Sequence, residues 1–196
     1  MRILRADKSN IPSVIQKLEA GEVIIIPTET VYGLAADGAC EEALEKIRRL
    51  KGGDPGKPLQ RLVSDVEEVR RRVRRWDARM DRLAARFWPG PLTLVLEDVG
   101  WRVPDHDFMR EVLRRFGRPL AATSANPAGE PPAVHCHDAV RMFEGKIDLA
   151  LDGGRGSVGK ASSVIRAAGP VLEILREEAI SREKLLECWE GGAEAS

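Results

Sequence analysis

The stretch EVIIIPTETVYGL, residues 22–34, passes from a short apolar run directly into a polar run that contains glycine. The apolar part, Glu22–Pro27, predicts a buried strand, because short apolar runs bounded by turn residues are typical of strands inside a sheet. Pro27 ends this strand, since proline has no N–H to donate to a ladder. If the chain stays extended, Thr28 and Thr30 project to one side, where two hydroxyl groups suit an amino-acid or nucleotide ligand. An edge strand with threonine favoured for its strand propensity explains the pattern equally well.

Three further segments have the same polar, glycine-rich character beside apolar runs: WPGPLT (88–93), PLAATSANPAGE (119–130) and DGGRGSVGKASSV (152–164). Glycine lets a backbone approach a ligand closely, and Ser, Thr and Asn offer it hydroxyl and amide groups. Four such segments predict one large polar pocket lined by several loop ends. Ser124 and Asn126 fall on one side of an extended chain, where they both donate and accept hydrogen bonds; helix N-capping is their alternative role.

Two segments combine glycine with basic residues, as loops that bind phosphate do. LKGGDPGKPL (50–59) carries Lys51 and Lys57, and the segment 152–164 carries Arg155 and a lysine. The first segment is not a P-loop, because Lys57 is followed by proline. A plain surface turn and a solvent loop are the alternative interpretations.

The chain length of 196 residues predicts one α/β domain with a sizeable core. Its 31 basic residues balance 31 acidic ones, which argues against a surface built as a whole to bind polyanions. The arginine-rich stretch 70–86 is interleaved with Asp77 and Asp81, so both a solvated helix face and an RNA contact stay open. No run reaches the ~18–20 apolar residues of a membrane span, and we expect a cytoplasmic protein whose three separated cysteines are free thiols.

Helix and strand signals occur in mixed order, which predicts an α/β sheet with mixed strand directions. We expect helices over residues 11–20, 41–50, 66–87, 108–116, 139–143 and 181–189, and strands over 22–27, 59–63, 92–97, 119–122, 149–151, 163–166 and 171–175. Asn10 and Ser181 are the expected N-caps of the first and last helices. The sequence has neither the spacing of a zinc site nor a nucleophile elbow, so no acid or base catalyst and no metal ligand is assigned.

In this order and spacing, the segments resemble the YrdC-type family of threonylcarbamoyl-AMP synthases over about residues 10–180. The blocks that carry the resemblance are PTETVYGL, K-G-x-x-x-x-x-P-L, WPGPLT, R-x-P at 102–104, PLAATSAN, DGG…SSV and ILREEAI at 174–180. The resemblance implies one YrdC-like domain over 1–196 with an open, twisted mixed sheet, helices packed outside and a large concave cavity lined by positive charge. The last residues, 190–196, are expected to form a flexible tail.

The same resemblance implies a nucleotidyltransferase that condenses L-threonine, bicarbonate and ATP, with Mg²⁺, to L-threonylcarbamoyl-AMP and pyrophosphate. The product would pass to separate transfer proteins that modify an adenosine of tRNA to N6-threonylcarbamoyladenosine. By position, the resemblance assigns threonine binding to Thr28, Arg102, Ala122 and Ser162, with the carbamate as an alternative contact of Ser162. It assigns ATP binding to Lys51, Ser124, Asn126 and Arg176, and pocket lining to Thr30, Tyr32 and Lys57.

One departure from the family pattern concerns Gly53, which stands where the family usually has the arginine of a K-x-R block. Loss of a phosphate-directed arginine would weaken ATP binding by roughly 1–3 kcal/mol, unless Lys57, Arg61 or Arg155 compensates. This departure keeps open an alternative, a non-catalytic YrdC-fold paralogue that binds double-stranded RNA through the cavity or the 70–86 face. A third interpretation, a carbamoyl-transferring relative of hydrogenase-maturation proteins, lacks the zinc-finger motifs of that family in this sequence.

Overall fold

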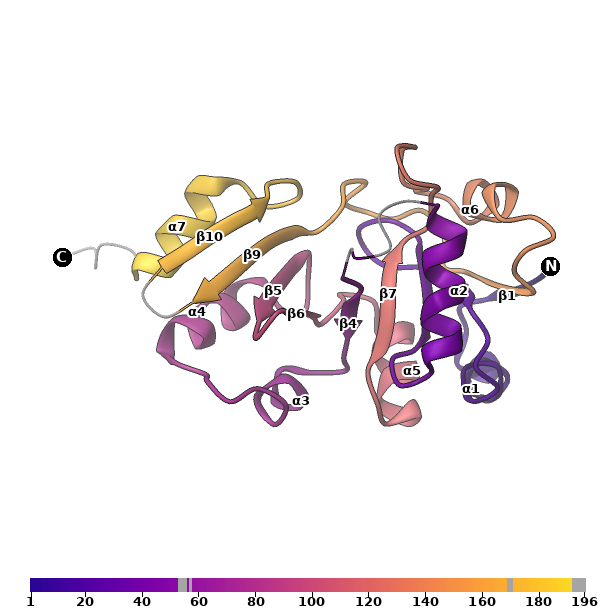
Figure 1. Cartoon of the computed structure of the whole chain (residues 1–196), viewed down its shortest axis with the longest axis horizontal. Coiled ribbons are helices and arrows are strands. Elements are labelled where there is room, and N and C mark those ends of the chain that lie inside the picture. The colour runs from indigo at the N-terminus through magenta and orange to yellow at the C-terminus, as the bar shows by residue number, and fades with distance from the viewer. Residues whose placement is uncertain (53–55, 57, 169–170, 192–196) are drawn as a thin grey trace.

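The computed structural model describes residues 1–52, 56, 58–168 and 171–191, and its strands form one twisted sheet of ten (Figure 1). In sheet order these strands are β1 (Arg2–Arg5), β8 (Leu149–Asp152), β2 (Ile24–Ile26), β3 (Gly33–Asp37), β7 (Leu120–Ser124), β4 (Gln60–Leu62), β6 (Val99–Arg102), β5 (Leu92–Leu96), β9 (Ser163–Ala168) and β10 (Val171–Arg176). The pairs β1–β8, β8–β2, β4–β6 and β5–β9 are parallel, and the other pairs are antiparallel. The predicted α/β fold with mixed strand directions is confirmed.

The helices of the described chain cover this sheet from outside. They are η1, a 3-10 helix (Lys8–Asn10), and the α-helices α1 (Ile11–Glu19), α2 (Glu41–Lys51), α3 (Val66–Arg70), α4 (Ala78–Phe87), α5 (Asp107–Phe116), α6 (Cys136–Met142) and α7 (Arg182–Glu190). Most of them begin and end within three residues of the predicted bounds.

The single helix predicted over residues 66–87 is wrong, because the chain forms two helices there, α3 and α4. Asp77 sits at the N-cap of α4, and its carboxylate accepts hydrogen bonds from the backbone N–H groups of Arg79 and Met80. Asp65 caps α3 in the same way through Glu68 N. An aspartate favours caps over helix interiors, so Asp77 starts a new helix where the apolar pattern alone suggested continuity.

Three strands were missing from the prediction: β1, β3 and β6. The sequence of β3, GLAAD, is poor in residues with high strand propensity. It forms a strand because β2 pairs with one of its edges and β7 with the other, so its backbone groups have partners on both sides. This pairing is set by distant parts of the chain and leaves no local signal.

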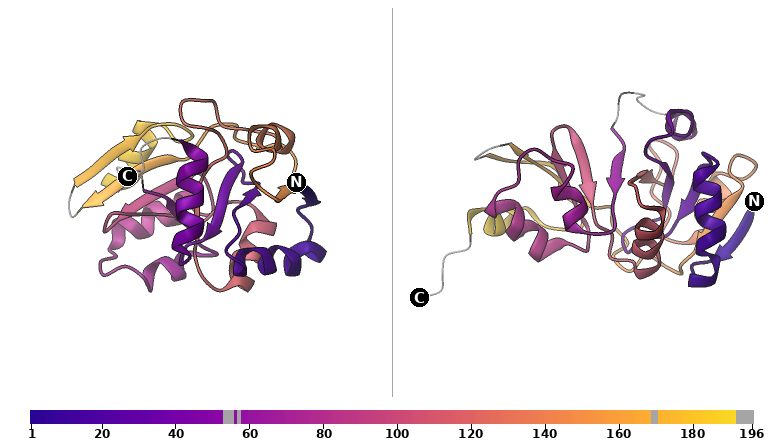
Figure 2. Two further views of the ribbon diagram at one scale, coloured as in Figure 1. Left: turned by 45° about the vertical axis from the view of Figure 1, so that its right-hand side comes forward. Right: turned by 90° about the horizontal axis from the view of Figure 1, so that it is seen from below.

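The helices cover both faces of one half of the sheet and a single face of the other half (Figures 1 and 2). In the first half, α1 and α5 pack with Ile24 and Ile26, while α2 and α6 pack with Ile25 on the opposite face. In the second half, α3, α4 and α7 pack against the face that carries Leu94 and Trp101. The short strand β4 lies between the two halves of the sheet. No helix of the described chain packs over the other face of β5, β6 and β9.

The two predicted N-cap residues lie where they were expected but do not cap their helices through their side chains. Asn10 and Ser181 occupy the N-cap positions of α1 and α7, but neither side chain makes a capping hydrogen bond. Asn10 Nδ2 instead donates to Arg5 O at 2.9 Å. Of the expected tail, Glu190 ends α7 and residues 192–196 lie outside the described residues. No helix within the described ranges has the length and apolar character needed to cross a membrane.

Candidate functional site

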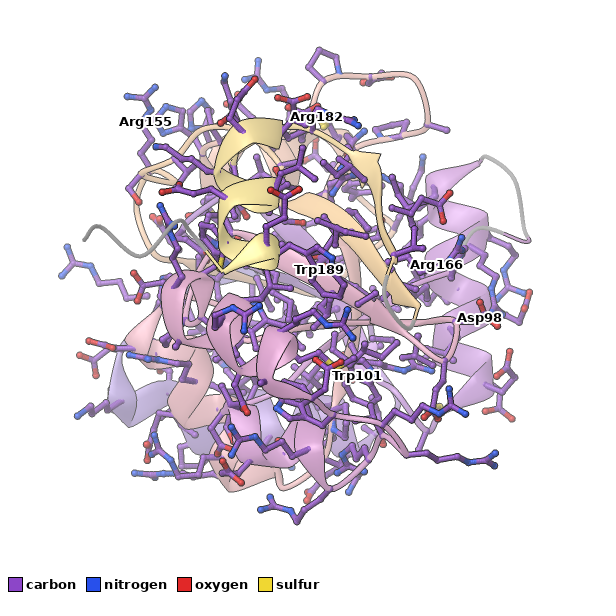
Figure 3. All side chains as sticks on the ribbon, turned by 90° about the vertical axis from the view of Figure 1, so that its left-hand side faces the viewer. Asp98, Trp101, Arg155, Arg166, Arg182 and Trp189 are labelled. Atoms are coloured by element: carbon purple, nitrogen blue, oxygen red, sulfur yellow. The ribbon has the colours of Figure 1, made fainter. Side chains whose placement is uncertain are left out.

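A cavity of about 560 Å³ lies over the uncovered face of the sheet. Each of the four polar segments contributes to its wall, through Thr28 and Thr30, Thr93, Ser124 and Ser162. The charged residues of the described wall are Arg48, Lys51, Arg102, Arg166 and Arg176 on the positive side and Asp98 on the negative side. Figure 3 shows Asp98 and Arg166 at the same side of the molecule. Arg48 and Arg166 also pair with carboxylates outside the wall, Glu41 and Glu45 for Arg48 and Glu173 for Arg166. The residues of the wall itself carry more positive than negative charge, which suits an anionic ligand.

Arg102, at the end of β6, is held at one end of the cavity by three hydrogen bonds. Its Nη2 donates to Glu29 Oε1 and to Thr30 Oγ1, both at 2.7 Å, and its Nε donates to Gly90 O at 3.2 Å. Arg102 is 2% exposed, and the second carboxylate oxygen of Glu29 is buried without a partner in the described structure. Only Thr93 of the WPGPLT segment faces the cavity; Gly90 of the same segment serves to orient Arg102.

The two threonines of PTETVYGL form a directed chain of hydrogen bonds that starts at Arg102. Thr28 Oγ1 donates to Val31 O at 2.7 Å, and it lies 2.8 Å from Thr30 Oγ1. The single hydroxyl proton of Thr28 is donated to Val31 O, so in the contact between the two hydroxyl groups Thr30 is the donor. Thr30 Oγ1 itself accepts a hydrogen bond from Arg102. One lone pair of Thr30 Oγ1 is left for a ligand. The two hydroxyl groups lie together, but the chain bends at residues 29–31 and is not extended there as predicted; Thr30 N also donates to Thr28 Oγ1, at 3.3 Å.

Ser162 and Arg176 lie on the neighbouring wall of the cavity. Arg176 donates to Ser162 O through Nε at 3.0 Å and Nη2 at 2.8 Å, and Nη2 also reaches Ser162 Oγ at 3.2 Å. Burial lowers the pKa of the Arg176 guanidinium below its usual value; Glu178 opposes this shift, and the charge of Arg102 adds to it. Two cations held this close favour a ligand with negative charge between them.

Lys51, Ser124 and Asn126 converge at the other end of the cavity. Lys51 Nζ lies 2.8 Å from Ser124 O, 2.6 Å from Asn126 O and 3.1 Å from Asn126 Oδ1. The segment after β7 also donates to Lys51, because Ala128 N donates a hydrogen bond to Lys51 O at 2.8 Å. The last turn of α2 is thus fastened to the segment that follows β7. Ser124 and Asn126 lie on one side of the chain, as their spacing predicted.

Tyr32 and Ala122 complete the wall between the two ends. The hydroxyl of Tyr32 points away from the cavity, because it donates to Gly154 O at 2.6 Å and accepts from Gly153 N at 3.2 Å. Burial raises the pKa of this tyrosine above its ordinary value. Tyr32 therefore fastens the loop after β8, while Ala122 lies in the middle of β7.

Of the residues expected to replace the missing arginine, neither of the two that the structure describes lies in the cavity wall. Arg61 and Arg155 do not line the cavity, and Lys57 and Gly53 lie outside the described residues. The segment 152–164 contributes small and polar residues to the wall, not its basic ones. Arg48 is a cation of the wall that the sequence analysis did not name. It lies one helical turn before Lys51, a spacing from which the sequence could have identified it.

The arginines of the 70–86 stretch are mostly engaged within the protein. Arg70 pairs with Glu67 and Asp81, and Arg72 pairs with Glu68. Arg79 pairs with Asp77, and Arg86 pairs with Glu187. Arg82 donates to carbonyl groups at the end of α7. These contacts favour the interpretation of a solvated helix face over that of an RNA-binding face.

Comparisons with known proteins give a consistent assignment. The family model for Sua5, yciO and yrdC proteins, described as telomere recombination, matches residues 16–178. The chain is 32% identical to the threonylcarbamoyl-AMP synthase of Bacillus subtilis (90% of this chain, 56% of that protein) and 33% identical to that of Chromohalobacter salexigens (79% and 90%). Sua5 of Pyrococcus abyssi, solved in complex with L-threonine, superposes with a TM-score of 0.89 at 30% identity (96% of this chain, 61% of that one). The chain spans about half the length of several curated relatives it matches.

Proposed function

The chain belongs to the Sua5, yciO and yrdC family, and from this we propose that it condenses L-threonine, bicarbonate and ATP to L-threonylcarbamoyl-AMP and pyrophosphate. The observation that carries the proposal is the cation-lined cavity, with Arg102 at one end and the Lys51, Ser124 and Asn126 cluster at the other. A cavity of about 560 Å³ has the size of known small-molecule sites.

The Arg102 end is proposed to bind threonine. A guanidinium group matches a carboxylate in shape and charge, and its fixed orientation reduces the entropy lost when the ligand binds. Thr28 and Thr30 lie beside Arg102, Ser162 lies on the neighbouring wall and Ala122 between the two ends, and the hydroxyl groups among them would meet the polar groups of the amino acid. The related Sua5 that was solved with L-threonine supports this assignment.

The Lys51 end is proposed to bind ATP as its Mg²⁺ complex. Lys51, Arg48 and Arg176 supply positive charge for the phosphates, while Ser124 and Asn126 supply polar contacts. Mg²⁺ commonly stays bound to phosphate oxygens and water with few protein ligands. A wall with a single carboxylate among its described residues therefore suits a metal ion that enters with the nucleotide.

The chemistry needs alignment more than acid–base catalysis. Threonine in its ammonium form and bicarbonate give the carbamate, one water and one proton. A carbamate oxygen then attacks the α-phosphorus of ATP; the new O–P bond forms as the bond to the β-phosphate oxygen breaks, and pyrophosphate leaves. The carbamate oxygen is already anionic, so the cations of the wall act by orienting the reactants and stabilising charge.

We further propose that the product serves tRNA modification to N6-threonylcarbamoyladenosine through separate transfer proteins, and that the protein acts in the cytoplasm. The described cysteines, Cys40, Cys136 and Cys188, are free thiols, which suits a reducing compartment.

Pyrophosphate release by the purified protein tests the proposal. Release from Mg²⁺-ATP is expected only when both L-threonine and bicarbonate are present, and the adenylate product is identified by mass spectrometry. A folded protein that releases no pyrophosphate under these conditions would contradict the proposed activity and favour the non-catalytic paralogue.

A further inference from the structure

A hydrogen-bonded row of four side chains crosses the cavity floor beside Arg102. Arg176 Nη2 lies 3.2 Å from Ser162 Oγ, Ser162 Oγ lies 2.9 Å from Thr93 Oγ1, and Thr93 Oγ1 donates to Gln60 Oε1 at 2.8 Å. All four residues line the cavity, and we refer to them as the transverse row. Neither Thr93 nor Gln60 carries a role assigned by family position.

The two ends of the transverse row fix the direction of every hydrogen bond in it. Arg176 can only donate, and the carbonyl oxygen of Gln60 can only accept. Thr93 gives its one proton to Gln60, so it accepts from Ser162, and Ser162 accepts from Arg176. Each hydroxyl oxygen therefore keeps one free lone pair. The amide nitrogen of Gln60 keeps two N–H donors, which have no protein partner within the described residues.

The row is continuous because β6 presents a glycine between Gln60 and Thr93. Gly100 lies on β6, between β4, which carries Gln60, and β5, which carries Thr93. A Cβ atom at Gly100 would come within 3.1 Å of Thr93 Cγ2 and 3.7 Å of Gln60 Cβ. Thr93 is 3% exposed and Ser162 is 2% exposed, so the middle of the row is a fixed part of the cavity floor.

The position of the row indicates which part of the substrates would lie beside it. In the antiparallel ladder of β5 and β6, Leu94 pairs with Trp101, and Thr93 and Arg102 are the adjacent residues on the two strands. The row therefore passes directly beside the arginine proposed to hold the threonine carboxylate. Arg176, at its far end, is proposed to contact the nucleotide. The group formed between threonine and the nucleotide is the carbamate.

We propose that the transverse row binds the one-carbon unit, first as bicarbonate and then as the carbamate, with Gln60 as the contact residue and Thr93 as the positioning residue. This inference rests on the proposed function. A carbamate has two acceptor oxygens and one N–H donor, which match N–H donors at Gln60 and Arg176 and free lone pairs between them. A phosphate offers acceptors alone, so the hydroxyl lone pairs would face its oxygens unpaired.

Thr93 acts through Gln60. Its hydroxyl proton occupies the carbonyl oxygen of Gln60 and thereby turns the amide N–H groups toward the cavity. Without that proton the amide is free to rotate, and the donors are no longer fixed. Thr93→Val keeps the shape of the side chain and removes the hydroxyl, whereas Thr93→Ser keeps the hydroxyl.

The test compares the apparent KM values for bicarbonate, threonine and ATP in the pyrophosphate-release assay. We expect Thr93→Val and Gln60→Glu to raise the bicarbonate KM about tenfold while the ATP KM changes by less than about threefold. Thr93→Ser is expected to restore the wild-type value to within about twofold. The matched control is Gln16→Glu on α1, an exposed position far from the cavity wall, which should leave all three constants unchanged.

The same data separate the possible failures. A wild-type protein that shows no turnover overturns the proposed function together with this inference. If the wild type is active, equal rises in all three constants, or a rise confined to ATP, would overturn the one-carbon assignment alone. Protection of each variant by threonine against thermal unfolding verifies that its fold and threonine site are intact, and Gln60→Glu decides the question if Thr93→Val does not fold.

Discussion

Replacement of Glu29 by alanine tests how firmly the buried ion pair holds Arg102. The side chains of Arg102 and Glu29 are 3% and 7% exposed, and Nη2 lies 2.7 Å from Oε1. The substitution leaves the guanidinium buried, with hydrogen bonds to Thr30 and Gly90 but no counter-charge. Removal of one partner of a buried pair costs about 3–5 kcal/mol of unfolding free energy. For a domain of this size, that corresponds to a fall in Tm of roughly 6–20 °C.

Urea unfolding followed by circular dichroism measures this change. Glu187→Ala is the control, because the Arg86–Glu187 pair has side chains 44% and 56% exposed and its loss should cost at most about 1 kcal/mol. The double variant Glu29→Leu, Arg102→Leu should be more stable than Glu29→Ala alone, since it leaves no uncompensated buried charge. If Glu29→Ala destabilises the protein no more than Glu187→Ala does, the argument that Glu29 holds Arg102 in place is refuted.

Three further predictions concern other parts of the cavity. Arg102→Ala should raise the threonine KM at least about tenfold and leave the ATP KM within about threefold; equal losses for both substrates would contradict its assignment. Gly53→Arg should leave the fold intact and tighten ATP binding by roughly 1–3 kcal/mol, and calorimetry that shows an unchanged Kd would mean that position 53 does not face the phosphates or that other residues already compensate in full. Burial lowers the pKa of His106 below its ordinary 6.5, against the opposing charges of Glu29 and Asp107. Its neutral form is therefore favoured by folding, so unfolding free energy should fall as the pH drops below about 6.5, and His106→Asn should flatten that fall; an unchanged pH profile would disprove the link.

The sequence predicted the parts of the fold that depend on local signals. The apolar run before Pro27, the helix that ends at Gly52 and the strand after WPGP carry their own periodicity and turn residues. The polar, glycine-rich character of the four segments likewise predicted their common cavity, although that cavity lies over a face of the sheet and includes residues within the strands as well as loop ends. Asp77 shows the limit: the prediction treated it as part of an exposed helix face, although its capping role interrupts the helix.

Sequence analysis missed the row that strand register forms, and within it gave no role to Gln60 or Thr93. These two residues and Ser162, which the resemblance had assigned to threonine binding, are distant in the chain, and the strand order β4–β6–β5–β9 brings them into one row. No spacing in the sequence encodes this order, since each partner is chosen by the packing of the whole sheet. Arg48 differs, because its relation to Lys51 is a helical spacing that a closer analysis of α2 would have found.

The strand β4 has a mechanical consequence. It is three residues long, and in the described sheet the strand ladder passes through it from the half bearing α1, α2, α5 and α6 to the half bearing α3, α4 and α7. Leu62 and the adjacent Val63 even belong to different apolar clusters, so the core itself is divided at this seam. The cavity spans the seam, with Lys51 on one side and Arg176 on the other. A ligand that contacts both Lys51 and Arg176 would therefore add a link between the two halves, beside β4 and the buried Arg102–Glu29 pair.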